Sequence, residues 1–129
     1  MPMTWTIEGR LVIINLIGTH ELDEFRETIN EAVASPGFRP GMHLFFDARS
    51  SYSYLTPEAI QRRLEFLATL VSKGVAPRCA VVTTQQRAGI SIRAAGKLEA
   101  FGMVMGVFLD MEEARMWLRE PLAGRGQAS

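Results

Sequence analysis

The chain has 129 residues, with 14 Lys and Arg against 14 Asp and Glu, a formal net charge of zero and 47% hydrophobic residues. These values are typical of one soluble globular domain and exclude a disordered chain, while the single cysteine excludes an internal disulfide framework. No apolar run approaches the ~20 residues of a membrane-spanning helix. Residues 1–10 lack the pattern of a secretory signal, so we expect a cytoplasmic protein.

The first part of the chain predicts a hairpin followed by a helix. Apolar segments on both sides of the Gly9-Arg10 turn indicate two antiparallel strands, residues 5–8 and 11–17. Thr19 is placed to cap a helix whose apolar residues recur at helical spacing until Pro36-Gly37 ends it.

The middle of the chain predicts a strand, a polar loop and a helix. Residues 42–47 are apolar at consecutive positions and are followed by the polar segment 48–55. Thr56, as a cap before Pro57, marks the start of the helix, and Lys73-Gly74 marks its end.

The last third of the chain continues the alternation. A strand at 78–84 leads to a helix that ends at Gly102, with Thr83 and Gln86 as its capping box. A strand at 103–109 leads to the last helix, which Asp110 caps.

The element order is therefore β-β-α-β-α-β-α-β-α. This order predicts an α/β fold with a mixed, mostly parallel five-stranded sheet and four main helices, in which the first strand is an antiparallel edge. We expect a single domain over residues 1–120 and a flexible tail over residues 121–129, because Pro121 ends the last helix.

Basic residues are concentrated in the middle of the chain. Residues 61–97 carry a net charge of +6, whereas residues 1–60 carry −4 and residues 98–129 carry −2. We expect these cations to point outward from two neighbouring helices, where they either bind an anionic surface or form an ordinary solvated face. A neutral chain without an aromatic–basic platform argues against nucleic acid. The candidates for contact with an anionic membrane or protein surface are Arg62, Arg63, Lys73, Arg93 and Lys97.

The polar loop after the strand at 42–47 is the strongest candidate site. It follows the carboxyl end of a parallel strand, where open α/β sheets place their binding sites. An ordinary polar connection is the alternative. The candidate ligand- or partner-binding residues, including one from the next strand end, are Asp47, Arg49, Ser50, Ser51, Tyr52, Tyr54 and Arg87.

No strong catalytic or metal-binding motif is present in the sequence. His20 and His43 lie apart, and no Cys or carboxylate spacing supports a metal site between them. Cys79 enters an apolar strand and is expected to be a small buried thiol. We therefore predict no catalytic residue, no metal and no cofactor.

Four segments of the chain share a pattern with a known family. They are the hairpin WTIEGRLVIINLIGTHELDEF, the strand HLFFDARSS, the strand AVVTT and the closing segment VFLDMEEARMWL. Together they cover about residues 4–120, and they resemble the SpoIIAA-like family, relatives of the STAS domain of anti-sigma-factor antagonists, with a wider likeness to lipid-binding CRAL-TRIO folds.

The resemblance implies a regulatory switch. In antagonists of this type a partner kinase phosphorylates a serine near a strand-to-helix junction. Ser50 and Ser51 lie in the matching region and are the phosphorylation candidates, whereas Tyr52 stands where the family pattern has glycine. The resemblance therefore implies a non-enzymatic binding or regulatory module that engages a protein partner, an anionic membrane surface or a small apolar ligand. Binding to a membrane surface would place the protein peripherally at the membrane. The alternative is a small enzyme that uses the loop Asp47–Tyr54 for acid/base chemistry.

Self-association is a further expectation. Consecutive apolar residues at 11–17 and 103–109 predict a sheet that is buried on both faces. If the helices cluster on one face, as the resemblance implies, the other face carries an apolar patch that a homodimer would cover.

Overall fold

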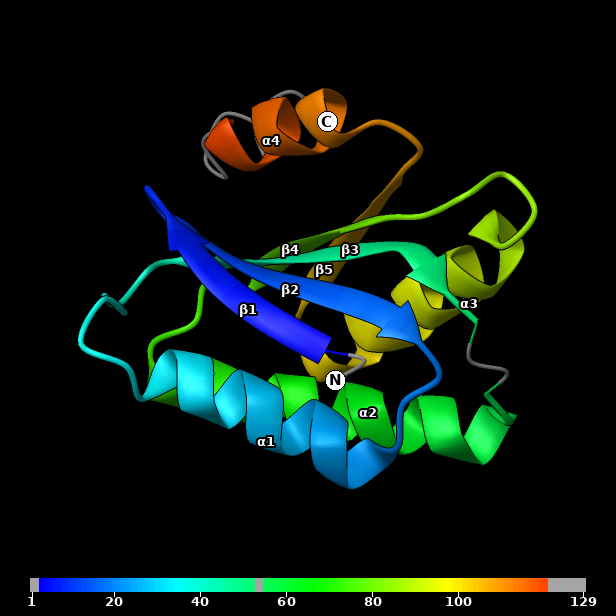
Figure 1. Cartoon of the computed structure of the whole chain (residues 1–129), viewed down its shortest axis with the longest axis horizontal. Coiled ribbons are helices and arrows are strands. Elements are labelled where there is room, and N and C mark those ends of the chain that lie inside the picture. The colour runs from blue at the N-terminus through cyan, green and yellow to red at the C-terminus, as the bar shows by residue number, and fades with distance from the viewer. Residues whose placement is uncertain (1–2, 53–54, 121–129) are drawn as a thin grey trace.

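The computed structural model describes residues 3–52 and 55–120, which fold as one α/β unit (Figure 1). In chain order the elements are β1 (Met3–Glu8), β2 (Leu11–Gly18), α1 (Leu22–Val33), β3 (His43–Ser51), α2 (Pro57–Thr69), a 3-10 turn (Leu70–Lys73), β4 (Arg78–Val82), α3 (Ala88–Leu98), a second 3-10 turn (Glu99–Phe101), β5 (Val104–Phe108) and α4 (Met111–Arg119). The expected tail at residues 121–129 lies outside the described residues.

The five strands form one sheet in the order β1-β2-β3-β4-β5. β1 is an antiparallel edge paired with β2, and the other neighbours are all parallel. Because each crossover moves to the next strand in the same direction, the connecting helices α1, α2 and α3 lie on one face of the sheet. The predicted mixed five-stranded sheet with four helices is confirmed.

The fourth helix corrects one expectation. Figure 1 shows α4 on the face opposite to α1, α2 and α3. The helices therefore do not all cluster on one face, because the chain crosses the sheet edge after β5 instead of adding another strand. The apolar patch from which we predicted a homodimer is partly covered by α4, and the homodimer itself stays a prediction.

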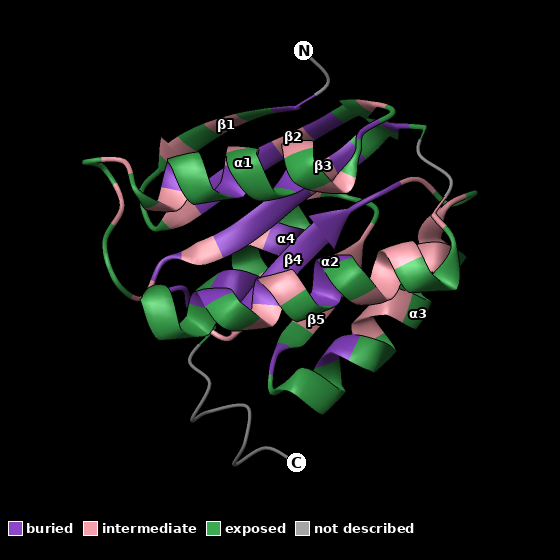
Figure 2. Ribbon diagram, turned by 90° about the horizontal axis from the view of Figure 1, so that it is seen from below, coloured by how far each residue is buried: buried purple, intermediate pink, exposed green. Residues whose placement is uncertain are grey.

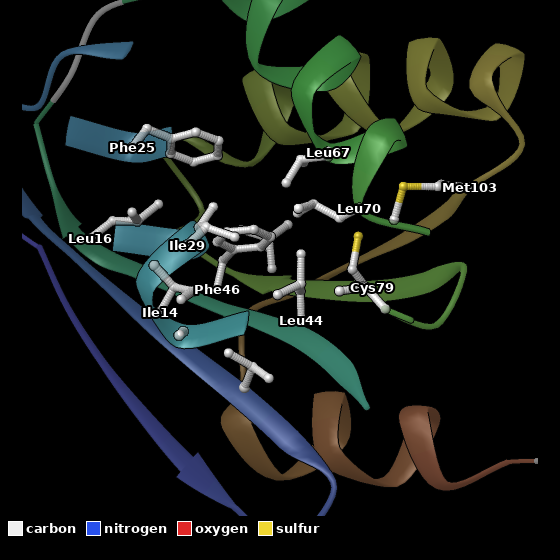
Figure 3. Packing of buried hydrophobic residues seen from close by; sticks show 14 of the residues in the cluster. Ile14, Leu16, Phe25, Ile29, Leu44, Phe46, Leu67, Leu70, Cys79 and Met103 are labelled. Carbon is white, nitrogen blue, oxygen red and sulfur yellow. The ribbon is translucent and has the colours of Figure 1, made fainter. Parts of the chain in front are cut away.

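Hydrophobic cores lie on both faces of the sheet, as the consecutive apolar residues predict. Alternate strand residues point to opposite faces. Figure 3 shows part of the larger core, where Ile14, Leu44 and Phe46 of the strands face Leu67 and Leu70. The smaller core under α4 consists of Ile13, Phe45, Ala80, Val82, Ala114 and Leu118. In Figure 2 the strands are buried chiefly in the middle of the sheet.

Two of the predicted helix caps are confirmed. Thr56 Oγ1 accepts a hydrogen bond from the Ala59 N–H at 3.1 Å, and Asp110 Oδ2 accepts one from the Glu113 N–H at 2.9 Å. Each satisfies a backbone donor that the first helical turn leaves free.

The other two predicted caps are wrong. α1 has Glu21 as its N-cap residue in place of Thr19, with no side-chain cap hydrogen bond. α3 begins at Ala88, so Thr83 and Gln86 do not form a capping box. The Thr83 N–H donates to Phe108 O at 2.9 Å, directly after β4 ends at Val82, and the helix begins only at Ala88.

The strand β3 is longer than predicted and absorbs half of the expected loop. β2 shifts its register between Asn15 and Ile17, and its last residues then pair with Ser50 and Ser51. The Tyr52 N–H extends this pairing by donating to Gly18 O at 2.8 Å. The prediction of a loop from residue 48 is therefore wrong up to Ser51.

Candidate functional site

A pocket lies between the helical layer and the carboxyl ends of the central parallel strands, with a volume of about 130 Å³. We call it the inner pocket. The strands and their ends contribute Leu16, Ala48, Ser51, Val81, Thr83 and Met105. The helices contribute Phe25, Ile60, Arg63, Leu67, Arg87, Ile90, Ser91 and Ala94, with Arg87 at the N-cap of α3. This is the edge at which open α/β sheets place ligand sites.

The walls of the inner pocket are mainly apolar. Figure 3 shows the side chains of Leu16, Phe25, Phe46 and Leu67, which all line it, packed between strands and helices. Apolar walls with a few polar groups are typical of small-molecule sites. The chemistry of the pocket therefore depends on its few polar side chains.

Arg63 is the most unusual of these polar side chains. It is only 7% exposed, and its Nη2 donates to His20 O at 3.1 Å. Its guanidinium carbon lies 5.0 Å from the centre of the Phe25 ring, within the range of a cation–π contact. Its Nε and Nη1 are buried and have no hydrogen-bond partner among the described residues. Burial lowers the pKa of Arg63, although Glu21 acts in the opposite direction.

His20 lies beside Arg63 and is also buried. Its Nε2 is 3.4 Å from Ser51 Oγ, so the two side chains are within reach of a weak hydrogen bond. Burial lowers the pKa of His20 to about 4, with added effects from the positive charges of Arg63 and Arg87. His20 is therefore neutral at pH 7 and contributes no positive charge to the pocket.

The charge of the inner pocket is one-sided. Two arginines, Arg63 and Arg87, are among its described lining residues, and no Asp or Glu is among them. Charges inside a low-dielectric cavity interact more strongly than at the surface. The described lining residues of the pocket thus include cations and no anion.

A second depression adjoins the inner pocket on the surface between α2 and α3; we call it the mouth groove. It shares Leu55, Ile60, Ile90 and Ala94 with the inner pocket. Its remaining lining residues are Pro57, Arg93 and Lys97. The shared residues make the two depressions continuous with each other.

The structure divides the residues predicted from the polar loop. Ser51 and Arg87 line the inner pocket, whereas Ser50 is exposed and Tyr52 is 68% exposed. Tyr54 lies outside the described residues. Because the side chain of Ser51 is buried, Ser50 is the more accessible phosphorylation candidate, and phosphorylation of either stays a prediction.

Asp47 and Arg49 form a separate surface pair. Arg49 Nη2 lies 2.8 Å from Asp47 Oδ2, and hydrogen bonds from Arg49 hold the pKa of Asp47 below its usual range. Neither residue lines the inner pocket. A carboxylate that is ionised and engaged with an arginine is poorly suited to acid/base catalysis at neutral pH. The geometry therefore gives no support to the alternative of an enzyme based on this segment.

The structure brings together only some of the residues predicted to form a basic face. The expectation that Arg63 points outward is wrong, because it lies three residues after Ile60 and four before Leu67 on the buried side of α2. Arg62 lines a shallow depression with Glu58 and Glu65. Among the cations named above, only Arg93 and Lys97 share the mouth groove, while Lys73 ends the 3-10 turn after α2.

The histidines and the cysteine carry no further site. His20 follows the carboxyl end of β2, whereas His43 pairs with Leu11 at the amino end, so the two lie at opposite ends of the sheet. Over residues 3–52 and 55–120, no group of three or more His, Cys, Asp or Glu residues is placed to hold a metal ion. Burial raises the pKa of the Cys79 thiol to about 12, as expected of an inert buried cysteine.

None of the described helices combines the length and the apolar character needed to cross a membrane.

Comparisons with known proteins agree with the fold. The sequence profile of the SpoIIAA-like family matches residues 11–119. No curated protein matches the chain.

Two solved structures are similar over nearly the whole chain. One is an uncharacterized protein with a SpoIIAA-like fold from Shewanella loihica, at 16% identity and a TM-score of 0.59, covering 90% of this chain and 91% of that one. The other is an anti-sigma factor antagonist from Mycobacterium paratuberculosis, at 14% identity and a TM-score of 0.59, covering 92% of this chain and 93% of that one. At these identities the likeness concerns the fold.

Proposed function

The chain belongs to the SpoIIAA-like family, and from this premise we propose that it is a non-enzymatic binding module whose ligand is a small, mainly apolar molecule. The ligand occupies the inner pocket, between the carboxyl ends of the strands and helices α2 and α3. The observation that carries the proposal is the mainly apolar lining of this pocket at the edge of the sheet where such folds bind ligands.

The size of the pocket supports a small ligand. A cavity of about 150 Å³ in another protein stays dry and binds benzene. The inner pocket has about 130 Å³, and the mouth groove adds space for a longer molecule. A ligand the size of one aromatic ring or a short alkyl chain therefore fits without unfolding the helices.

Ligand binding would also provide a regulatory output. α2 and α3 both line the pocket, so a ligand that favours one spacing of these helices shifts the population toward it. Ser50 and Tyr52 are exposed at the end of β3, one on each side of the pocket residue Ser51 in the sequence. This placement favours, as a second function, a protein partner that binds the end of β3 and senses the state of the pocket.

Two predictions about the surface remain, contact with an anionic membrane and self-association, and each depends on few residues. Contact with an anionic membrane surface depends chiefly on Arg93 and Lys97 at the mouth groove. Self-association depends on what remains exposed around α4, including Leu109 and Met116. Both stay predictions.

Binding of a neutral apolar probe tests the proposed function. We expect 1-octanol to raise the melting temperature of the full chain and to bind at one site by calorimetry. Ala94→Phe fills the pocket from α3 and should abolish this binding, whereas Ala95→Phe, on the next residue and outside the lining, should not. Absence of octanol binding, or equal binding by both variants, would contradict the proposal. Native mass spectrometry of protein purified from cells then identifies a co-purifying ligand.

A further inference from the structure

We propose that the ligand of the inner pocket is an amphipathic carboxylate, with its anionic group held by Arg63 at the inner end and its apolar part directed toward the mouth groove. This inference rests on the proposed function and specifies the chemistry of the ligand.

The first argument is the unsatisfied guanidinium. Nε and Nη1 of Arg63 together carry three N–H bonds, and both atoms are buried without an acceptor in the described residues. An arginine remains charged in proteins even when burial lowers its pKa. A buried charge with unused donors is strongly unfavourable unless a partner arrives, and a carboxylate is the partner whose geometry a guanidinium matches best.

The second argument is the absence of a competing acid in the pocket. No described lining residue is Asp or Glu, and Arg87 is a second cation among them. Glu21 affects Arg63 from the adjoining outer depression that both residues line, but forms no salt bridge with it in the described part of the chain. Among the described residues no carboxylate pairs directly with Arg63, which leaves its guanidinium available to an anionic ligand.

The third argument concerns the rest of the ligand. Apart from Arg63 and Arg87, the polar lining consists of the neutral His20 and three hydroxyl side chains. This set offers few partners for a sugar, a nucleotide or a doubly charged phosphate. The residues that the inner pocket shares with the mouth groove are apolar, among them Ile60, Ile90 and Ala94. An alkyl or aromatic body thus fits behind a single carboxylate.

Because Nε and Nη1 of Arg63 are buried, a carboxylate can reach them only if the side chain moves. Both nitrogens are covered by neighbouring atoms. The guanidinium must turn slightly toward the cavity, which would change its contact with the Phe25 ring while Nη2 stays bonded to His20 O. We therefore expect the ligand to displace water and side chains locally without opening the sheet.

Matched probes test the inference on the full chain. Octanoate carries the carboxylate, octanamide is its neutral counterpart, and octyl phosphate carries the other common anionic group. We expect octanoate to bind at least about tenfold more tightly than octanamide, the effect of a hydrogen bond to a charged group. Arg63→Met should remove this preference, and Arg62→Met, on the adjacent exposed residue, should preserve it.

The outcomes separate this inference from the proposed function. If octanoate and octanamide bind equally and Ala94→Phe blocks both, the inner pocket is supported as the binding site but the preference for a carboxylate is overturned. Preference for octyl phosphate over octanoate would also overturn it. Absence of binding by octanoate, octanamide and 1-octanol would contradict both proposals.

A measurement on the unmodified protein covers the case in which Arg63→Met fails to fold. The carboxyl carbon of ¹³C-labelled octanoate reports its ionisation when bound. We expect contact with Arg63 to lower the pKa of the bound carboxyl below that of free octanoate, because a nearby cation favours the ionised form. An unchanged or raised pKa would overturn the inference.

Discussion

Two buried arginines at opposite ends of the sheet show what distinguishes a structural cation from a binding one. Arg78, at the start of β4, is 1% exposed, and its Nη2 donates to Trp117 O at 2.7 Å. Its guanidinium carbon also lies 4.7 Å from the centre of the Trp117 ring. Arg63 is nearly as buried and also donates from Nη2 to a backbone oxygen, but its side chain lines an apolar cavity instead of tying a helix to the sheet.

The surroundings of the two arginines differ in charge as well. The depression beside Arg78 includes Glu8 and Glu120 among its lining residues. The inner pocket beside Arg63 has no acid among its described lining residues. Arg78 therefore fastens α4 to the sheet within the chain, whereas Arg63 is prepared for an anion from outside. Replacing Arg78 should therefore mainly lower stability, whereas replacing Arg63 should mainly change ligand binding.

The largest expected effect is on the Arg78 side. Arg78→Met removes the hydrogen bond and ring contact to Trp117 and loosens the docking of α4. We expect the free energy of unfolding to fall by ~2 kcal/mol, because a hydrogen bond from a charged donor is lost together with the contact to the Trp117 ring. Urea unfolding measures this directly. A loss below ~0.5 kcal/mol would show that α4 is held by its apolar residues alone.

The next effect is a pH dependence of the folding stability, which comes from His20 beside Arg63. Because the folded state keeps His20 neutral until about pH 4, the unfolded chain binds more protons between pH 6.5 and 4. Stability should therefore fall as the pH is lowered through this range, by ~2 kcal/mol from this group. Urea unfolding at several pH values measures the slope, and His20→Gln should flatten it. An unchanged slope in that variant would assign the effect to other groups.

A smaller effect is expected when Arg63 itself is replaced. Arg63→Met removes an incompletely satisfied buried charge and leaves an apolar side chain of similar length. We expect stability to change by less than ~1 kcal/mol, because an apolar replacement for a buried ion is often neutral. A loss comparable to that of Arg78→Met would mean that Arg63 is a structural tie, and the contrast between the two arginines would disappear.

The smallest effect belongs to the pair Asp47–Arg49, which lies outside both regions. Half of the Arg49 side chain is exposed, at 49%. Asp47→Asn should cost less than ~1 kcal/mol, because exposed ion pairs contribute little. It should also leave octanoate binding unchanged. A loss of binding in this variant would move the functional site back to the segment that the sequence favoured.

Much of the fold could be predicted because the local signals agree with one another. The caps at Thr56 and Asp110, the hairpin at Gly9-Arg10 and the apolar strands all specify elements that the structure contains. The caps at Thr19 and Thr83 were predicted wrongly, because α1 and α3 begin at Leu22 and Ala88, several residues after each strand ends, and the Thr83 N–H bonds to Phe108 O. Local capping preferences alone therefore do not determine where these two helices begin.

The candidate site could be predicted only in part. Ser51 and Arg87 were identified because each was predicted to follow the carboxyl end of a strand, where α/β folds bind ligands. Arg63 was counted as a surface charge, although its spacing from Ile60 and Leu67 placed it on the buried face of α2. The position of His20 beside it depends on the path of the chain from β2 to α1, which the sequence pattern does not specify.

A crystal structure of the protein with octanoate tests the central claim most directly. The account predicts the alkyl chain in the inner pocket and the carboxylate within hydrogen-bond distance of Arg63 Nη1 or Nε. The opposite orientation, with the carboxylate at Arg93 and Lys97 in the mouth groove and the alkyl chain against Arg63, would contradict it.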